Sequence, residues 1–149
     1  MGAVHEVEGA PLRWLLAAAL VMAGALPAGP AGEDDGVRVI ELTARHSRIS
    51  PGHVEVPAGT HVRFVVRNLD PIDHELIVGD AGVHARHATG TEPYHPPRPG
   101  EATVLAGAEA ATTYRFEEPG VVEFGCHLPG HWAYGMRGTV TVGPVSPRR

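Results

Sequence analysis

Cysteine is almost missing from this chain: among 149 residues there is one, Cys126. A single cysteine cannot form an internal disulfide, and a free thiol in an oxidising compartment is a liability unless it is buried or bound to a metal. Methionine is scarce as well, and beyond the N-terminal apolar segment it occurs once, at Met136. Lysine is absent, so the 12 cationic side chains are all arginines. The scarcity of sulfur draws attention to the short stretch that holds both Cys126 and Met136.

Long apolar runs are equally scarce, and the one present lies near the N-terminus, at residues 14–26. It is too short to span a bilayer comfortably, and small residues and prolines follow it, as in a secretory signal. We expect residues 1–31 to be a signal peptide cleaved after Ala25 or Ala31, and residues 32–36 to be a linker. An apolar tail or an uncleaved anchor is the alternative. Export would place the mature protein in the periplasm or outside the cell, without a membrane span.

Acidic residues outnumber basic ones in the mature chain. Without residues 1–31, eleven arginines face fifteen carboxylates, a net charge of −4 with neutral histidines. That balance argues against nucleic acid as a partner. The roughly 118 residues that remain suffice for one β-sandwich with its own core and leave no room for a second domain.

From residue 36 onward, short apolar stretches alternate with Gly, Pro, Asn and Asp. No stretch shows a sustained helical period, and about eight short strands with turns between them indicate a sandwich. We therefore predict an all-β, single-domain, antiparallel Greek-key β-sandwich over residues 37–143, with a flexible tail at 144–149. The expected strands cover residues 37–42, 54–60, 61–68, 75–78, 102–105, 112–116, 121–124 and 139–142.

The loop at residues 126–136 carries Cys126, His131 and Met136, separated by Gly and Pro. A buried cysteine or methionine is usually a packing residue, but here both fall in one glycine-rich loop with a histidine between them. A thiolate, two imidazoles and a weak axial thioether are the ligands of type 1, or blue, electron-transfer copper. The loop supplies three of these four groups, so a second histidine must come from elsewhere.

His74 is the leading candidate for that second histidine, because it follows a turn and begins an expected strand whose end can lie beside the Cys126 loop. His53, His61 and His95 are the alternatives. Since copper requires a deprotonated thiolate, metal binding would also protect Cys126 from oxidation.

These residues carry a family resemblance. The stretch Cys126-His127-Leu128-Pro129-Gly130-His131 resembles the loop of azurin, residues 136–142 resemble the strand that follows it, and residues 56–60 with Val62, Phe64 and Asn68 resemble earlier strands. The chain thus resembles cupredoxins of the azurin, plastocyanin and pseudoazurin kind. The resemblance implies a Greek-key β-sandwich with one type 1 copper held by His74, Cys126, His131 and axial Met136. It also implies electron transfer without substrate turnover.

Three positions depart from the family pattern. Glu75 stands where small blue-copper carriers have an asparagine that ties the two ligand loops together, and an ionised carboxylate cannot donate a hydrogen bond. Asp73 replaces a glycine that in azurin offers a carbonyl to the metal. His127, directly after Cys126, resembles the histidine that binds a neighbouring copper in nitrite reductases and multicopper oxidases, but we interpret it here as a surface or supporting residue.

Residues 79–100 are polar and proline-rich and interrupt the strand rhythm, with an expected helical turn at residues 83–88. They contain His84, His87 and His95. Two histidines three apart share one face of a helical turn, so these three are a candidate secondary metal site, with solvated loop histidines as the alternative.

Two functions follow. The first is an exported electron carrier, not an enzyme, that meets a redox partner through a weak, transient apolar patch near His131, made by Leu128, Pro129, Trp132 and Tyr134. The second is a copper sequestration or delivery protein for copper homeostasis or resistance.

Overall fold

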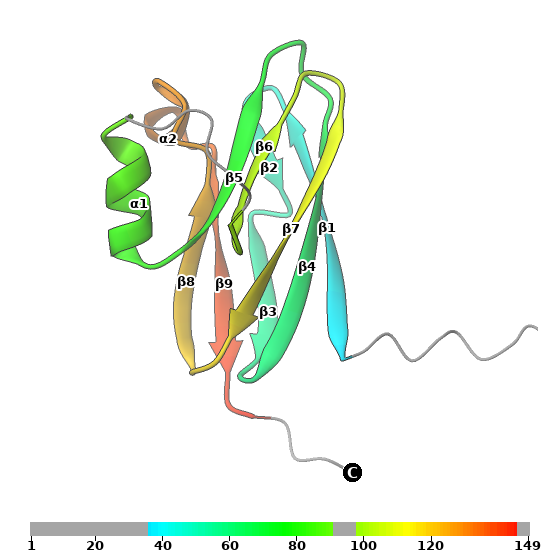
Figure 1. The fold of residues 1–149 in the computed structure, drawn as a ribbon, viewed down its shortest axis with the longest axis vertical. Coiled ribbons are helices and arrows are strands. Elements are labelled where there is room, and N and C mark those ends of the chain that lie inside the picture. Colours follow the sequence, from blue (N-terminus) through cyan, green and yellow to red (C-terminus); the bar gives the residue numbers. More distant parts are fainter. Residues whose placement is uncertain (1–35, 91–97, 146–149) are drawn as a thin grey trace, which may run out of the picture. The chain divides into compact units, whose positions relative to one another are not determined.

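Two packed β-sheets make up most of the part of the chain that the structure, a computed structural model, describes: residues 36–90 and 98–145 (Figure 1). The first sheet has the strand order β2-β1-β4-β7 and the second has the order β3-β9-β8-β5-β6. The first comprises β1 (Val37–Arg45), β2 (Arg48–Ser50), β4 (Thr60–Asn68) and β7 (Glu109–Phe116). The second comprises β3 (His53–Pro57), β5 (His74–Gly79), β6 (Glu101–Val104), β8 (Gly120–Gly125) and β9 (Arg137–Gly143).

The predicted β-sandwich is confirmed, but its sheets are mixed and not wholly antiparallel. Strand β1 runs parallel to β4, and β3 runs parallel to β9, while the other pairs are antiparallel. Parallel neighbours need a crossover connection. Here β2 and β3 lie between β1 and β4 in the chain and belong to different sheets. The strand β2 was not predicted, because three residues are too few to show an alternation.

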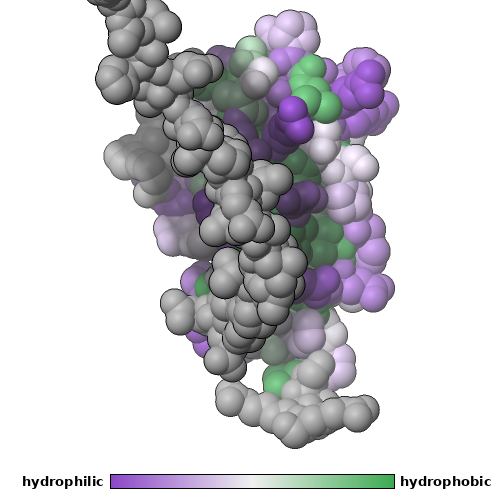
Figure 2. All heavy atoms as spheres, turned by 90° about the vertical axis from the view of Figure 1, so that its right-hand side faces the viewer, coloured by the Kyte–Doolittle hydropathy of each residue, from purple (hydrophilic) through white to green (hydrophobic). Residues whose placement is uncertain are grey.

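The core lies between the sheets and is built from alternate residues of the strands. Val62, Phe64 and Val66, which were expected to face one way, are all buried. The ring of Phe64 contacts those of Phe116 and Phe124, at centroid distances of 6.2 and 6.5 Å. On the outer face of the first sheet the intervening positions are exposed or half-buried. Figure 2, which views this side, shows mostly hydrophilic residues where grey atoms do not cover it.

Helix α1 (Ala81–Ala88) confirms the expected helical turn and extends it. The Asp80 side chain caps it by accepting the Val83 backbone N–H at 2.9 Å. The helix packs against β5, and a Cβ on Gly79 would come within 2.8 Å of Val83. All six residues of β5 are buried as a result, since one face of the strand meets the core and the other lies under α1.

A second helix, α2 (His131–Tyr134), is a single turn that the sequence pattern did not predict. Gly130 and Gly135 flank it with φ of 83° and 99°, a left-handed conformation that glycine adopts without strain. Both helices lie at the side of β5 and β8 (Figure 1). Neither helix in the described ranges has the length and apolar character needed to cross a bilayer.

Candidate metal centre

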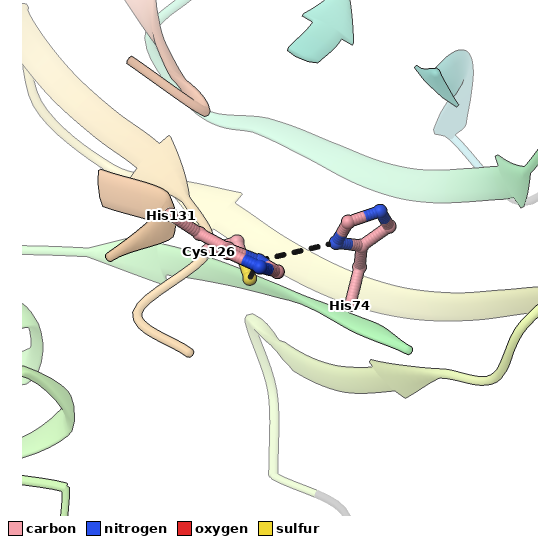
Figure 3. Close-up of side chains that lie close together, drawn as sticks. All are labelled: His74, Cys126 and His131. Carbon is pink, nitrogen blue, oxygen red and sulfur yellow. Dashed lines mark hydrogen bonds between the residues drawn. The ribbon is translucent and has the colours of Figure 1, made fainter. Parts of the chain in front are cut away.

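Three side chains from separate elements meet at one end of the second sheet (Figure 3). His74 begins β5, Cys126 directly follows β8, and His131 begins α2. Because β5 and β8 are antiparallel, with Ile77 opposite Gly125, the start of one and the end of the other lie together. The His131 Nδ1 lies 3.2 Å from the Cys126 Sγ and 3.3 Å from the His74 Nδ1. One ligand atom from each residue lies within 4.8 Å of the others.

The loop that follows Cys126 is closed by its own backbone hydrogen bonds. The Cys126 N–H donates to the Met136 carbonyl and the Met136 N–H donates to the His131 carbonyl, both at 3.0 Å. A Cβ on Gly125 would lie 2.7 Å from the Met136 carbonyl, so a glycine is needed at this close approach. Met136 is fully buried on the same loop. The backbone therefore holds the loop in shape without a metal.

Asp70, which the sequence analysis overlooked, orients His74. Its Oδ2 lies 2.8 Å from the His74 Nε2, and since a carboxylate only accepts, Nε2 carries the proton. The Nδ1 lone pair of His74 therefore faces His131, as in metal-ligating histidines held by a carboxylate. Burial opposes ionisation of Asp70, but hydrogen bonds from the Ser47 N–H, His74 and the His46 N–H lower its pKa overall. The one hint in the sequence was an acidic residue four positions before the histidine.

Asn68 holds the turn that leads into His74. Its side-chain amide donates to the carbonyls of Ile72, Val104 and Leu105, at 2.8 to 3.1 Å. Its carbonyl oxygen accepts the Asp70 N–H at 2.9 Å. This fully buried side chain thus positions both Asp70 and the start of β5.

The thiol of Cys126 is completely buried, and burial raises its pKa to about 11 despite hydrogen bonds from the backbone N–H groups of Glu75 and Leu128. The Glu75 N–H lies 3.4 Å from the sulfur. Burial and repulsion from His74 lower the pKa of His131, against an opposing effect of Asp70. Without a metal the cysteine is therefore a thiol at neutral pH, and a metal must displace its proton.

Glu75 ties the two ligand-bearing segments together as an acceptor. Its Oε1 accepts the backbone N–H of His127 at 2.8 Å, which links β5 to the loop after β8. Glu75 can therefore link the two segments even though an ionised carboxylate cannot donate a hydrogen bond.

The other histidines considered as ligands in the sequence lie away from Cys126, beside His127 or outside the described residues. His53 bonds to Thr139 and His61 lies on β4, and neither belongs to the group around Cys126. His84 and His87 lie on α1 next to His127, whereas His95 lies outside the described residues. The residues of the predicted apolar patch surround His131 in sequence, and among them Tyr134 is 60% exposed.

Known copper-binding proteins are similar to this chain in sequence and in fold. The model of the family "Copper binding proteins, plastocyanin/azurin family" matches residues 43–143. The copper-resistant cuproprotein CopI of Rubrivivax gelatinosus is 35% identical over 98 residues, 64% of this chain and 59% of that protein. Its namesake in Pseudomonas aeruginosa is 29% identical, with 77% of this chain and 81% of that protein covered. The chain thus spans less than two thirds of the first relative's length.

A solved structure of auracyanin B is similar in fold, with a TM-score of 0.61 at 27% identity over 72% of this chain and 89% of that one. The auracyanin-B sequence of Chloroflexus aurantiacus is 30% identical over 106 residues, 61% of this chain and 45% of that protein.

Proposed function

This chain belongs to the plastocyanin/azurin family of copper-binding proteins, and we propose that it is an exported electron carrier with a mononuclear type 1 copper site. Copper is the cofactor that the family and the donor set support. We assign His74, Cys126 and His131 as its ligands and Met136 as the weak axial ligand. The observation that carries this proposal is the convergence of one buried thiol and two imidazoles from three separate elements.

Preorganisation of the ligands supports electron transfer. Copper bound here would supply one-electron redox chemistry between Cu(II) and Cu(I). Asp70 fixes the His74 ring and the backbone hydrogen bonds fix the loop from Cys126 to Met136. Ligands held in this way need little rearrangement when the metal changes charge. His74, Cys126 and Met136 are buried, so they would keep water from a copper ion bound here.

Electrons would enter and leave through the His131 side of the site. His131 is partly exposed, whereas His74 is 1% exposed. The apolar patch of Leu128, Pro129, Trp132 and Tyr134 would give a redox partner a weak contact that exchanges rapidly. The apolar run at residues 14–26 supports a location outside the cytoplasm.

Copper resistance is the second candidate function, and the names of the relatives favour it. Two proteins with 35% and 29% identity to this chain are called copper-resistant cuproproteins. A protein with this role would bind copper to hold or deliver it. Fast, reversible voltammetry with copper retained in both oxidation states supports the carrier. Transfer of copper to an acceptor on reduction supports the resistance function.

Absorption and electron paramagnetic resonance spectra of the copper-loaded protein test the site itself. We expect an intense visible thiolate-to-copper band, which Cys126→Ser abolishes because a hydroxyl cannot replace the thiolate. His61→Gln, a change outside the site, should keep the band. A wild-type protein that binds copper without this band would refute the type 1 assignment. A normal band in His74→Ala would refute the assignment of His74.

A further inference from the structure

We propose that His84 and His127 form a second metal site that takes Cu(II), distinct from the site at Cys126. The Nδ1 of His84 lies 2.8 Å from the Nε2 of His127, with ring centroids 5.1 Å apart. The two residues come from α1 and from the loop after β8. Docking of α1 beside β5 therefore brings together two imidazoles that are 43 positions apart in the chain.

The proton of His84 can be placed from its other nitrogen. Its Nε2 lies 3.1 Å from the Glu123 carbonyl oxygen, which can only accept a hydrogen bond. Nε2 therefore carries the proton, and Nδ1 presents a lone pair to His127. A backbone carbonyl that holds the distal N–H in this way is the usual support of a metal-ligating histidine.

His127 is held in place on several sides. Its ring stacks on Trp132 at a centroid distance of 4.3 Å and an angle of 10°, and its backbone N–H bonds to Glu75. These contacts fix the position of the His127 ring beside His84.

The separation of the two nitrogens is compatible with Cu(II). Two nitrogens at roughly 2.0 Å from a metal lie about 2.8 Å apart when they subtend a right angle, as neighbouring ligands of a square-planar ion do. The observed separation is 2.8 Å, which is also the length of a hydrogen bond. Nitrogen ligands generally bind Cu(II) more tightly than Zn²⁺, so Cu(II) is the metal expected here.

Further donors and solvent access lie beside the pair. His127 lines two surface hollows, one shared with Glu75 and His87 and the other with His84 and Trp132. The His87 ring is 6.2 Å from that of His127, and its Nδ1 lies 3.9 Å from the Glu75 Oε2. A metal on His84 and His127 can thus complete its coordination with water or with these neighbours. The proposed site shares His84 with the expected group of His84, His87 and His95, of which His95 lies outside the described residues.

The other explanation of the short contact is a hydrogen bond alone, in which the His127 Nε2–H donates to the His84 Nδ1. A copper titration separates the two. The full apoprotein is titrated with Cu(II) and followed by visible absorption, electron paramagnetic resonance and bound metal. We expect the protein to bind one equivalent of Cu(II) at the type 1 site, which gives the visible thiolate band, here called the coloured equivalent. We expect one additional equivalent that gives a copper signal in electron paramagnetic resonance but no thiolate band.

The variant His84→Gln should keep the coloured equivalent and weaken the additional one at least about tenfold. His127→Gln should also weaken binding of the additional equivalent. It serves as the test if circular dichroism shows that His84→Gln does not fold. The control His61→Gln should bind as the wild type, and because all variants share the other histidines, binding elsewhere cancels in the comparison.

Binding of the coloured equivalent alone would overturn the proposal and leave the hydrogen bond as the explanation. Equal binding by His84→Gln, His127→Gln and His61→Gln would also overturn it. The proposal does not rest on the type 1 site. A wild type without the thiolate band would refute the proposed function but not the second site. Loss of the additional equivalent in His84→Gln would still support the second site in that case.

Discussion

Asp70 contacts the proposed metal centre only through the imidazole of His74. A substitution at Asp70 therefore tests how a nearby charge affects the reduction potential of bound copper. Its carboxylate accepts hydrogen bonds from His74 and from the backbone of His46 and Ser47. We predict that Asp70→Asn raises the reduction potential, because loss of a nearby negative charge destabilises Cu(II) more than Cu(I). It should also lower the free energy of unfolding by about 1–3 kcal/mol, since the amide cannot accept all three N–H groups.

Voltammetry and acid-dependent unfolding check this prediction. The folded pKa of Asp70 lies below 3.8, so its stabilising effect is fully present above pH 3.8 and is lost as the pH falls through the folded pKa. The stability difference between wild type and Asp70→Asn should therefore shrink only in strong acid. Asp73→Asn is the control, because this half-buried carboxylate of the same turn bonds to the Ala106 N–H and not to His74. Equal potentials for all three proteins would contradict the prediction.

Met136 should tune the copper and not assemble the site, since an axial thioether forms a long, weak bond. Met136→Leu nearly keeps the buried volume and removes the sulfur, so we predict a higher reduction potential with the colour retained. Met136→Gln should lower the potential, because an oxygen donor favours Cu(II). Voltammetry on the three proteins measures both shifts. Unchanged potentials in both variants would mean that Met136 only packs beside the site.

At the scale of elements, the site depends on the contact between β5 and the loop after β8, which Glu75 bridges through the His127 N–H. We predict that Glu75→Ala lowers apoprotein stability by about 1–2 kcal/mol and speeds copper loss to a chelator, because the partly buried N–H of His127 is left without its acceptor. Glu75→Gln keeps an accepting oxygen and should stay near the wild type in both measurements. If Ala and Gln behave alike, the bridge does not hold the loop.

Strand positions could be predicted because burial of one face imposes an alternation on the sequence, as in residues 61–68, where Val62, Phe64 and Val66 are buried. Alternation does not say which strand lies alongside or in which direction it runs. The parallel pairing of β1 with β4 was therefore missed. The turn of α2 was missed for a related reason, since it forms through loop-closing hydrogen bonds and two glycines and has no apolar face of its own.

The proposed copper site at Cys126 could be predicted from the sequence, because Cys126 and Met136 are rare residue types that lie in one loop. Recognising them does not require the fold to be known. His74 could be proposed from its place before a strand. Asp70 and the contact of His84 with His127 could not, because they depend on how a turn folds back and where α1 docks. The spacing along the chain grouped His84 with His87 and His95, and it could not show the contact of His84 with His127, which depends on the docking of α1.

At the scale of the whole molecule, the core extends well beyond the metal centre. The buried cluster includes the proposed ligands Cys126 and Met136, but most of it, such as Leu42, Phe64 and Phe116, consists of residues that are not proposed ligands. A core of this kind does not need a metal to form, and the loop after β8 is closed by backbone hydrogen bonds. We therefore expect the apoprotein to fold, with sheet signal by circular dichroism.

Copper should nevertheless raise the melting temperature, because a ligand that binds the folded state stabilises it by mass action. At a free copper concentration a thousand times the dissociation constant, the gain is about 4 kcal/mol. For a domain of this size that corresponds to a shift of more than about 10 °C, measurable by calorimetry. Cys126→Ser should lose most of the shift, because the thiolate is the strongest ligand, while His61→Gln should retain it. An apoprotein without sheet structure would show instead that the metal organises the sandwich, and an equal shift in Cys126→Ser would place the stabilising copper elsewhere.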